Sequence, residues 1–388
     1  MKVSIDTRTI KKGEYFVPIK GPNFDGNKFV DDALKKGARG VITESDLYEL
    51  VRKKLDTQKP IIIAVAGSVG KSTFRSYLYS ILKTKYKTLE SDLNTKIGFS
   101  LAVMNKFNRH KIIVAEVGID RIGEMEDTAK LVSPKISIIT KLGKEHLEFF
   151  KNYRNVVKEE SKACNFTQSN FVYINSIDIP DYNKYACSKF KFKKYNIIPR
   201  NRLVFTKIND LLIPPHEKEY LFGIYLICIK HFKFTNEEFI KALKKIKKPK
   251  GRFNIIEIQN NSIVIDDTYN AVCDQTIISG VKFVIELSKK LKKQLVVVMP
   301  NMVENGASAE AQHKNVAKYL NSCGISNLYL AGDNLGYYKE YLNINYISVN
   351  FADELNIKQQ DNTIYYIKAT RRYKGPELVE KLKYRHTK

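Results

Sequence analysis

The sequence lacks tryptophan and is poor in cysteine, with five cysteines among 388 residues. Cys164, Cys187, Cys228, Cys273 and Cys323 are scattered along the chain, and no two of them form a C-x-x-C pair. This spacing argues against a structural zinc site, because zinc ligands usually come in closely spaced pairs. It is typical of a reducing compartment, so we expect a cytoplasmic protein.

Long apolar segments are also missing. The longest apolar run covers residues 220–229, whereas a helix that spans a bilayer needs about 20 apolar residues. The first six residues show no apolar stretch of the signal-peptide kind, so we expect no signal peptide. With 43% hydrophobic residues in a chain of 388, the sequence predicts a globular protein of two or three domains without a membrane span.

Acidic residues are outnumbered, since 41 Asp and Glu stand against 66 Lys and Arg and leave a formal net charge of +25. Such an excess can indicate binding to nucleic acid or to a membrane surface. Here the lysines are spread along the whole chain, with local runs at 241–250 and 288–293 and no basic tail. We interpret the charge as a solvated surface that favours anionic substrates, and we expect no specific nucleic-acid partner.

The most informative segment covers residues 61–82. The apolar run 61–66 predicts a buried strand, and residues 74–82 predict a helix. Between them lies a phosphate loop of the pattern G-x-x-G-K-S, tighter than the common G-x-x-x-x-G-K form. Glycines let backbone N–H groups point at an anion, and the helix N-terminus adds partial positive charge. The residues expected to bind the nucleotide here are Gly67, Ser68, Gly70, Lys71, Ser72 and Thr73.

Alternating strand and helix patterns predict an α/β protein of three domains. Residues 1–58 are expected to form a small N-terminal α/β domain. Residues 59–250 are expected to form a central P-loop ATPase domain, whose apolar runs at 111–116 and 136–140 predict a mostly parallel sheet. Residues 251–388 are expected to form a C-terminal Rossmann-like domain, with strands at 262–266, 294–299, 327–331 and 363–367.

Polar residues follow several predicted strands, at the edge where open α/β sheets bind ligands. Glu116 ends a buried strand and suits a contact with Mg²⁺, but a solvent-facing glutamate fits the pattern equally well. His146 follows the next strand, either as a ligand or as an ordinary surface histidine. Asp266 and Asp267 end the first strand of the last domain, where two acids suit ribose or metal binding, or cap a helix.

Together these features resemble the Mur ligases, the ATP-dependent amide ligases of peptidoglycan precursor synthesis. The resemblance runs nearly end to end, and its C-terminal part is most similar to the family member that adds D-alanyl-D-alanine. The matching positions are 4–8, 13–17, 21, 25–26, 29 and 33–38 near the N-terminus, 67–73, 94, 97–98, 116–118, 123–124, 134 and 143–146 in the centre, and 251–252, 267–271, 302–306, 313, 368–371 and 377 near the C-terminus.

The resemblance implies that ATP phosphorylates a substrate carboxylate and that an amine then attacks the acyl phosphate. It implies that Lys71 holds the β- and γ-phosphates, while Arg252 reaches the γ-phosphate when the C-terminal domain closes. Ser72 and Glu116 would hold one Mg²⁺, and His146 the second. The other implied contacts are Asp267 with the ribose, Tyr269 and Asn270 with the base, Lys368 and Arg371 with the amine substrate, and Asp6, Thr7, Arg8, Asn94 and Thr95 with the acyl substrate.

One departure from the family concerns a lysine, carbamylated by CO₂, that members carry fourteen residues after the metal histidine; in this sequence that position is Glu160. A carbamylated lysine is in effect a long carboxylate, so we expect Glu160 to supply the charge directly, without CO₂. Lys158 and Lys162 flank it and leave a shifted register open. An ordinary glutamate on a helix surface is the remaining alternative.

Positions that recognise substrates have drifted as well. Lys141 replaces an asparagine, residues 272–273 replace an asparagine-proline pair, and Asn301 replaces an aspartate. Residues 216–220 stand where family members seat adenine. The N-terminal block is shorter than in typical members, so we expect it to keep an anion-binding function but to grip a uridine nucleotide loosely.

We therefore expect an ATP- and Mg²⁺-dependent ligase that forms an amide bond, with addition of D-alanyl-D-alanine to a UDP-muramoyl tripeptide as the leading function. Its expected partners are small molecules, namely a carboxylate acceptor, with or without a UDP group, and an amino acid or dipeptide amine. Three alternatives stay open at this point. They are a related ligase that acts on another carboxylate, a non-catalytic relative, and a P-loop ATPase that binds nucleic acid.

Overall fold

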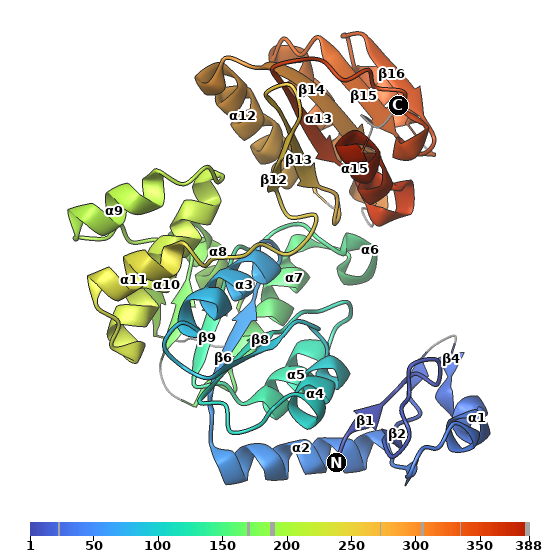
Figure 1. Ribbon diagram of the computed structural model, residues 1–388, viewed down its shortest axis with the longest axis vertical. Helices are drawn as coiled ribbons and strands as arrows, with labels where there is room; N and C mark the ends of the chain where they lie inside the picture. Colours follow the sequence, from blue (N-terminus) through green and yellow to red (C-terminus); the bar gives the residue numbers. More distant parts are fainter. Residues whose placement is uncertain are drawn as a thin grey trace. The chain divides into compact units, whose positions relative to one another are not determined.

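The computed structural model describes residues 1–21, 24–168, 171–186, 191–271, 273–303, 306–333 and 335–384 (Figure 1). Cys187, Val272, Glu304 and Asn305, which the sequence analysis considered, lie outside the described residues. The chain forms two compact units, one of Met1–Leu142, Val157–Ile197 and Gly223–Ile246, the other of Gly143–Val156, Ile198–Phe222 and Lys247–Lys388. The predicted α/β class is confirmed, and the predicted domain boundaries at 58 and 250 stay predictions.

The first unit begins with a small parallel sheet in the order β1-β2-β5, beside which β3 and β4 pair antiparallel. Helix α2 starts from a capping box between Thr43 and Asp46 and buries Leu47, Val51 and Leu55 along one face. The elements of this part are β1 (Val3–Ser4), β2 (Tyr15–Phe16), β3 (Lys20–Gly21), β4 (Phe24–Asp25), the 3-10 helix Gly26–Phe29, α1 (Val30–Lys35), β5 (Gly40–Val41) and α2 (Glu44–Gln58).

A six-stranded parallel sheet, in the order β11-β10-β9-β6-β8-β7, frames the rest of the first unit. Its central strands are buried apolar runs, as is typical of parallel sheets covered by helices. The elements from 61 to 243 are β6 (Ile61–Ala66), α3 (Lys71–Leu82), β7 (Thr88–Ser91), α4 (Lys96–Asn105), β8 (Ile112–Glu116), α5 (Glu124–Val132), β9 (Ile136–Ile139), α6 (Leu147–Phe150), α7 (Tyr153–Ser161), β10 (Val172–Ile174), α8 (Ile179–Tyr185), β11 (Phe192–Lys194), α9 (Arg202–Asn209), α10 (Pro215–Phe232) and α11 (Asn236–Leu243). Of these, α6 and α9 belong to the second unit, and α7 and α10 are divided between the two units.

The second unit contains a six-stranded sheet in the order β12-β13-β17-β14-β15-β16, in which only β12 runs antiparallel to its neighbour. Successive residues of β17 alternate between two cores, so Tyr366 packs with α12 and α13 while Ile367 packs with α15. The elements are β12 (Asn254–Ile258), β13 (Ser262–Asp267), α12 (Asp274–Leu291), β14 (Gln294–Pro300), α13 (Ala309–Ser322), β15 (Asn327–Ala331), α14 (Gly336–Tyr341), β16 (Tyr346–Val349), β17 (Thr363–Lys368) and α15 (Gly375–Tyr384). The four strands predicted for this part are confirmed.

The longest apolar run, residues 220–229, lies in α10. Within the described ranges, no helix is both long and apolar enough to cross a membrane. Most of the run is buried, including Tyr220, Leu221 and Ile224, while Ile229 is exposed.

Candidate functional site

The phosphate loop joins β6 to α3, as the sequence predicts, although the helix already begins at Lys71 rather than Phe74. Gly67 and Gly70 have φ angles of 109° and 90°, a region that favours glycine. A Cβ atom at Gly67 would lie 2.6 Å from Thr140 Oγ1 and 2.8 Å from Thr140 N. Only glycine therefore fits this turn, which brings the loop against the end of β9.

The loop is fastened by the backbone of the segment after β9. The N–H groups of Ser68 and Val69 donate to the carbonyl oxygen of Lys141, at 2.8 and 3.0 Å. Because the contact uses the main chain of Lys141, the drift from asparagine to lysine at this position leaves it intact. Lys71 is the first residue of α3, and its Nζ donates to the carbonyl oxygen of Ser68 at 3.3 Å.

Ser72 and Glu116, predicted to hold Mg²⁺, are brought together by neighbouring strands β6 and β8. The Ser72 hydroxyl donates to Glu116 Oε1 at 3.0 Å. Glu116 is 6% exposed, so its alternative reading as a solvent-facing residue is wrong. Arg75, which the sequence analysis missed, donates from Nε to Glu116 Oε2 at 3.1 Å and pairs through Nη1 with Glu90.

Glu160 lies fully buried in α7 and contacts the phosphate loop. Its Oε2 accepts a hydrogen bond of 2.8 Å from the backbone N–H of Gly67. The alternative of a surface glutamate is therefore wrong. The preceding Glu159 accepts from the N–H groups of Gly123 and Met125, at 2.7 and 3.2 Å, and thereby holds the start of α5.

Lys162 forms an ion pair with Glu159, at 2.8 Å between Nζ and Oε2. Glu160, at the position predicted to replace the carbamylated lysine, is the residue that accepts a hydrogen bond from the phosphate loop. Sequence reasoning missed Glu159, because nothing local distinguishes its side chain from that of Glu160.

Asn94 and Thr95, expected to bind the acyl substrate, precede α4. Thr95 is the N-cap of this helix and accepts from the N–H of Gly98 at 3.1 Å. The carbonyl oxygen of Asn94 accepts from the N–H of Gly118 at 3.0 Å. A Cβ at Gly118 would lie 2.5 Å from Asn94 Nδ2, so these two segments are packed closely just after Glu116.

His146 belongs to the second unit, where it is the N-cap of α6 in a left-handed conformation with a φ of 50°. Among the described residues, no group of three or more His, Cys, Asp or Glu side chains could hold a metal ion. A second-metal role for His146 therefore stays a prediction.

The C-terminal candidates gather at the ends of β13 and β17. Asp267 Oδ2 accepts from Lys368 Nζ at 2.9 Å and from the Tyr366 hydroxyl at 3.0 Å. The Lys368 side chain is only 5% exposed, and in this structure its ammonium group pairs with Asp267. Asp266 bonds the backbone and hydroxyl of Thr268, which forms a turn rather than a helix cap.

Two arginines lie over the ring of Tyr269. The guanidinium of Arg252 is 3.9 Å and that of Arg371 5.6 Å from the ring centroid. Arg252 Nη1 also donates to Asn270 Oδ1 at 3.2 Å, while its buried Nε has no hydrogen-bond partner among the described residues. Arg252, Tyr269, Asn270 and Arg371 thus form one cluster, close to the Asp267–Lys368 pair in sequence.

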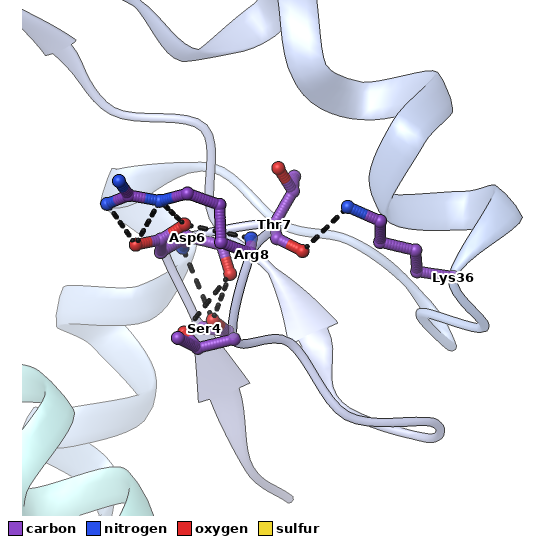
Figure 2. Close-up of polar contacts among 6 residues, drawn as sticks. Ser4, Asp6, Thr7, Arg8 and Lys36 are labelled. Carbon is purple, nitrogen blue, oxygen red and sulfur yellow. Dashed lines mark hydrogen bonds and ion pairs between the residues drawn. The ribbon is translucent and has the colours of Figure 1, made fainter.

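The N-terminal candidates form a different kind of arrangement (Figure 2). Arg8 donates from Nε and Nη2 to the carboxylate of Asp6, and these hydrogen bonds lower the pKa of Asp6 to about 2. The Arg8 side chain is nonetheless 86% exposed. The Thr7 carbonyl oxygen accepts from Lys36 Nζ at 3.2 Å.

Beside this pair lies a hollow of about 420 Å³ with an apolar floor. Phe24 and Phe29, 47% and 40% exposed, stack with ring centroids 5.6 Å apart. Sequence reasoning had no signal for this pair as a site, because isolated aromatics are common in any chain. The hollow is lined by Ile5, Asp6, Thr7, Arg8, Phe16, Ile19, Phe24 and Phe29.

Comparisons with known proteins identify similar sequences and folds. The Mur ligase family catalytic domain matches residues 2–68, and the Mur ligase middle domain matches residues 65–208. The chain is 26% identical to a UDP-N-acetylmuramoyl-tripeptide–D-alanyl-D-alanine ligase of Buchnera aphidicola, over 98% of this chain and 93% of the relative.

Solved structures agree in fold. MurF from Acinetobacter baumannii matches with a TM-score of 0.81 at 18% identity, covering 98% of this chain and 93% of that one. MurF from Thermotoga maritima in complex with ADP matches with a TM-score of 0.79 at 20% identity, covering 98% and 96%. From its two matching domains, its end-to-end relative and its fold, the chain belongs to the Mur ligase family.

Proposed function

We propose that the chain is an ATP-dependent ligase that joins D-alanyl-D-alanine to a UDP-N-acetylmuramoyl tripeptide. The observation that carries the proposal is the phosphate loop with the Ser72–Glu116 pair at its exit, in a chain of this family. The full-length relative from Buchnera aphidicola has this activity in its name. A solved neighbour holds ADP, which supports ATP as the cosubstrate.

The proposed reaction has two steps. A carboxylate oxygen of the tripeptide attacks the γ-phosphorus of ATP, ADP leaves, and an acyl phosphate forms. The dipeptide amine then attacks the acyl carbon, the amine loses a proton, and phosphate leaves with the oxygen that came from the carboxylate. Lys71 and the N–H groups of the loop meet the negative charge that develops on the phosphoryl group.

The residues at the loop fit Mg²⁺, because a hydroxyl and a carboxylate supply the hard oxygen ligands that this ion prefers. Ser72 Oγ and Glu116 Oε1 already lie 3.0 Å apart. When bound, Mg²⁺ would neutralise charge on the phosphates. Phosphate oxygens and water would supply further ligands.

Glu160 is proposed to supply the carboxylate that other family members make by carbamylation. Its contact with Gly67 N places a buried carboxyl group directly against the phosphate loop. The glutamate side chain carries this group without modification, so we propose that the enzyme needs no CO₂. The roles of His146, Arg252, Asp267, Tyr269, Asn270, Lys368 and Arg371 stay as the resemblance implies them.

The N-terminal hollow is proposed to hold the distal part of the acyl substrate. Arg8 stands at its rim and suits a diphosphate or carboxylate through bidentate hydrogen bonds. The stacked Phe24 and Phe29 rings offer an apolar face to a planar ring. Because both rings and Arg8 are exposed, we expect a loose grip on the nucleotide.

Phosphate release in an omission series tests this function. We expect release to require ATP, Mg²⁺, UDP-N-acetylmuramoyl tripeptide and D-alanyl-D-alanine together, with a product that mass spectrometry identifies as the pentapeptide. Replacing D-alanyl-D-alanine by L-alanyl-L-alanine is the matched control and should give little product. Release that ignores the amine and the tripeptide would contradict the proposal.

A further inference from the structure

Arg75 is a buried cation whose position nothing in the reaction scheme explains. It lies in the first turns of α3 and is 5% exposed. Its guanidinium contacts two carboxylates, Glu116 Oε2 through Nε at 3.1 Å and Glu90 Oε1 through Nη1. Burying an arginine is costly unless its donors are used, and here two carboxylates accept from them.

The two oxygens of Glu116 have different partners. Oε1 accepts from the Ser72 hydroxyl, and Oε2 accepts from Arg75 Nε. Ser72 and Arg75 are three residues apart on α3 and therefore share a face of the helix. Helix α3 thus donates to both oxygens of the Glu116 carboxylate, and Oε1 is the oxygen on the side of the phosphate loop.

Glu90 anchors the other side of the guanidinium. It belongs to β7, which pairs in parallel with β8, the strand that ends in Glu116. A planar guanidinium can bridge two carboxylates on neighbouring strands, whereas a lysine ammonium is a single point of charge. Arg75 thereby ties the position of Glu116 to the sheet as well as to α3.

We propose that Arg75 is a positioning residue that sets the orientation of Glu116 for Mg²⁺ binding without touching the nucleotide. The inference deepens the proposed function and rests on its Mg²⁺ and ATP requirement, but not on the identity of the amine or the tripeptide. Partners that orient metal ligands typically change metal affinity by about 10- to 100-fold when they are replaced.

The test is calorimetric binding of ADP to the full chain across a Mg²⁺ titration, together with binding in EDTA. In Arg75→Lys we expect the Mg²⁺ concentration for half-maximal enhancement of ADP binding to rise about tenfold. ADP binding in EDTA should stay the same, because Lys71 and the loop amides are intact. Arg75→Met should shift the midpoint further, if it folds, and Arg75→Lys keeps the test decisive if it does not.

Glu90→Gln is the matched control, because it keeps the size of the side chain and leaves the Arg75–Glu116 contact in place. Its Mg²⁺ midpoint should move less than that of Arg75→Lys. An Arg75→Lys protein that is less heat-stable but has an unchanged Mg²⁺ midpoint would overturn the inference in favour of a merely structural ion pair. An equal loss of ADP binding in EDTA would overturn it too. Because no acyl or amine substrate enters this experiment, a failure of the proposed ligase activity would be seen separately.

Discussion

Two arginine–carboxylate pairs in the first unit have the same chemistry and opposite surroundings. The side chains of Arg75 and Glu116 taken alone are 6% and 7% exposed, whereas those of Arg8 and Asp6 are 86% and 33% exposed. Both pairs form at least one charge-assisted hydrogen bond of ordinary length. From this difference in burial we infer that the Arg75–Glu116 pair holds its side chains in place, while Arg8 can turn toward a ligand.

The largest effect is expected in the phosphate loop, next to the buried pair. Lys71→Ala should lower ATP turnover about 10³-fold, because it removes a charge that meets the developing phosphoryl charge. Substrate-dependent phosphate release measures the loss. The control is Lys130→Ala, an exposed lysine of α5 that should keep full turnover. Near-normal turnover in a folded Lys71→Ala protein would remove this lysine from the mechanism.

The comparison itself is tested by removing each arginine in turn. Arg75→Met should lower the free energy of unfolding by about 3 kcal/mol, because it leaves the buried carboxylate of Glu116 and the partly buried one of Glu90 without their cation. Arg8→Met should leave the denaturant midpoint unchanged, because an exposed pair contributes little to stability. Chemical denaturation of both variants gives the contrast, and equal losses would show that burial does not separate the two pairs.

For binding of the acyl substrate, in contrast to stability, the exposed Arg8 should matter. Arg8→Ala should weaken the binding of UDP-N-acetylmuramoyl tripeptide about tenfold, by the loss of a charge-assisted contact. The matched control is Arg39→Ala, an exposed arginine that does not line the hollow. Calorimetry measures both. An Arg8→Ala protein that binds as tightly as the parent would place the acyl substrate elsewhere.

The exposed pair also has a pH signature. The pKa of Asp6 is lowered from 3.8 to about 2 by its hydrogen bonds to Arg8. Because the pair is exposed, this depressed pKa contributes only a little stability, which is present above pH 3.8 and is lost as the pH falls through about 2. In Arg8→Ala the pKa should return toward 3.8, which an NMR titration of the Asp6 carboxyl would show. A midpoint that stays near 2 would assign the shift to another group.

The smallest effect is expected for CO₂, whose removal should leave the activity unchanged. Activity should depend on Mg²⁺ but not on CO₂, because Glu160 already places a carboxylate against Gly67. Turnover is compared in CO₂-stripped buffer with and without added bicarbonate. Restoration by bicarbonate, or a carbamate on Lys158 or Lys162 detected by carbon-13 NMR, would contradict this account of Glu160.

Sequence reasoning was most successful where the signal is local. The strand, loop and helix of residues 61–82 and the four strands of the C-terminal part could be predicted, because apolar runs and glycine spacing determine them within a few residues. The edge strands β12 and β16 were missed, because their residues are only partly buried and lack a continuous apolar run.

Pairings between distant residues could not be predicted in the same way. Arg75 meets Glu116 across 41 positions, and Asp267 meets Lys368 across 101. Nothing in the local pattern separates Arg75 from the other cations of this lysine-rich chain, or shows that Lys368 is buried. Glu160 was found through its distance from His146 in the family pattern, but its contact with Gly67, 93 positions away, came only from the fold.

The central claim, amide ligation through an acyl phosphate, has one direct test. UDP-N-acetylmuramoyl tripeptide labelled with oxygen-18 in the reacting carboxylate is incubated with ATP, Mg²⁺ and D-alanyl-D-alanine, and the released phosphate is analysed by mass spectrometry. The account predicts that each phosphate carries one labelled oxygen from the carboxylate. Phosphate without the label, released whether or not the tripeptide is present, would identify a simple ATPase and contradict the account.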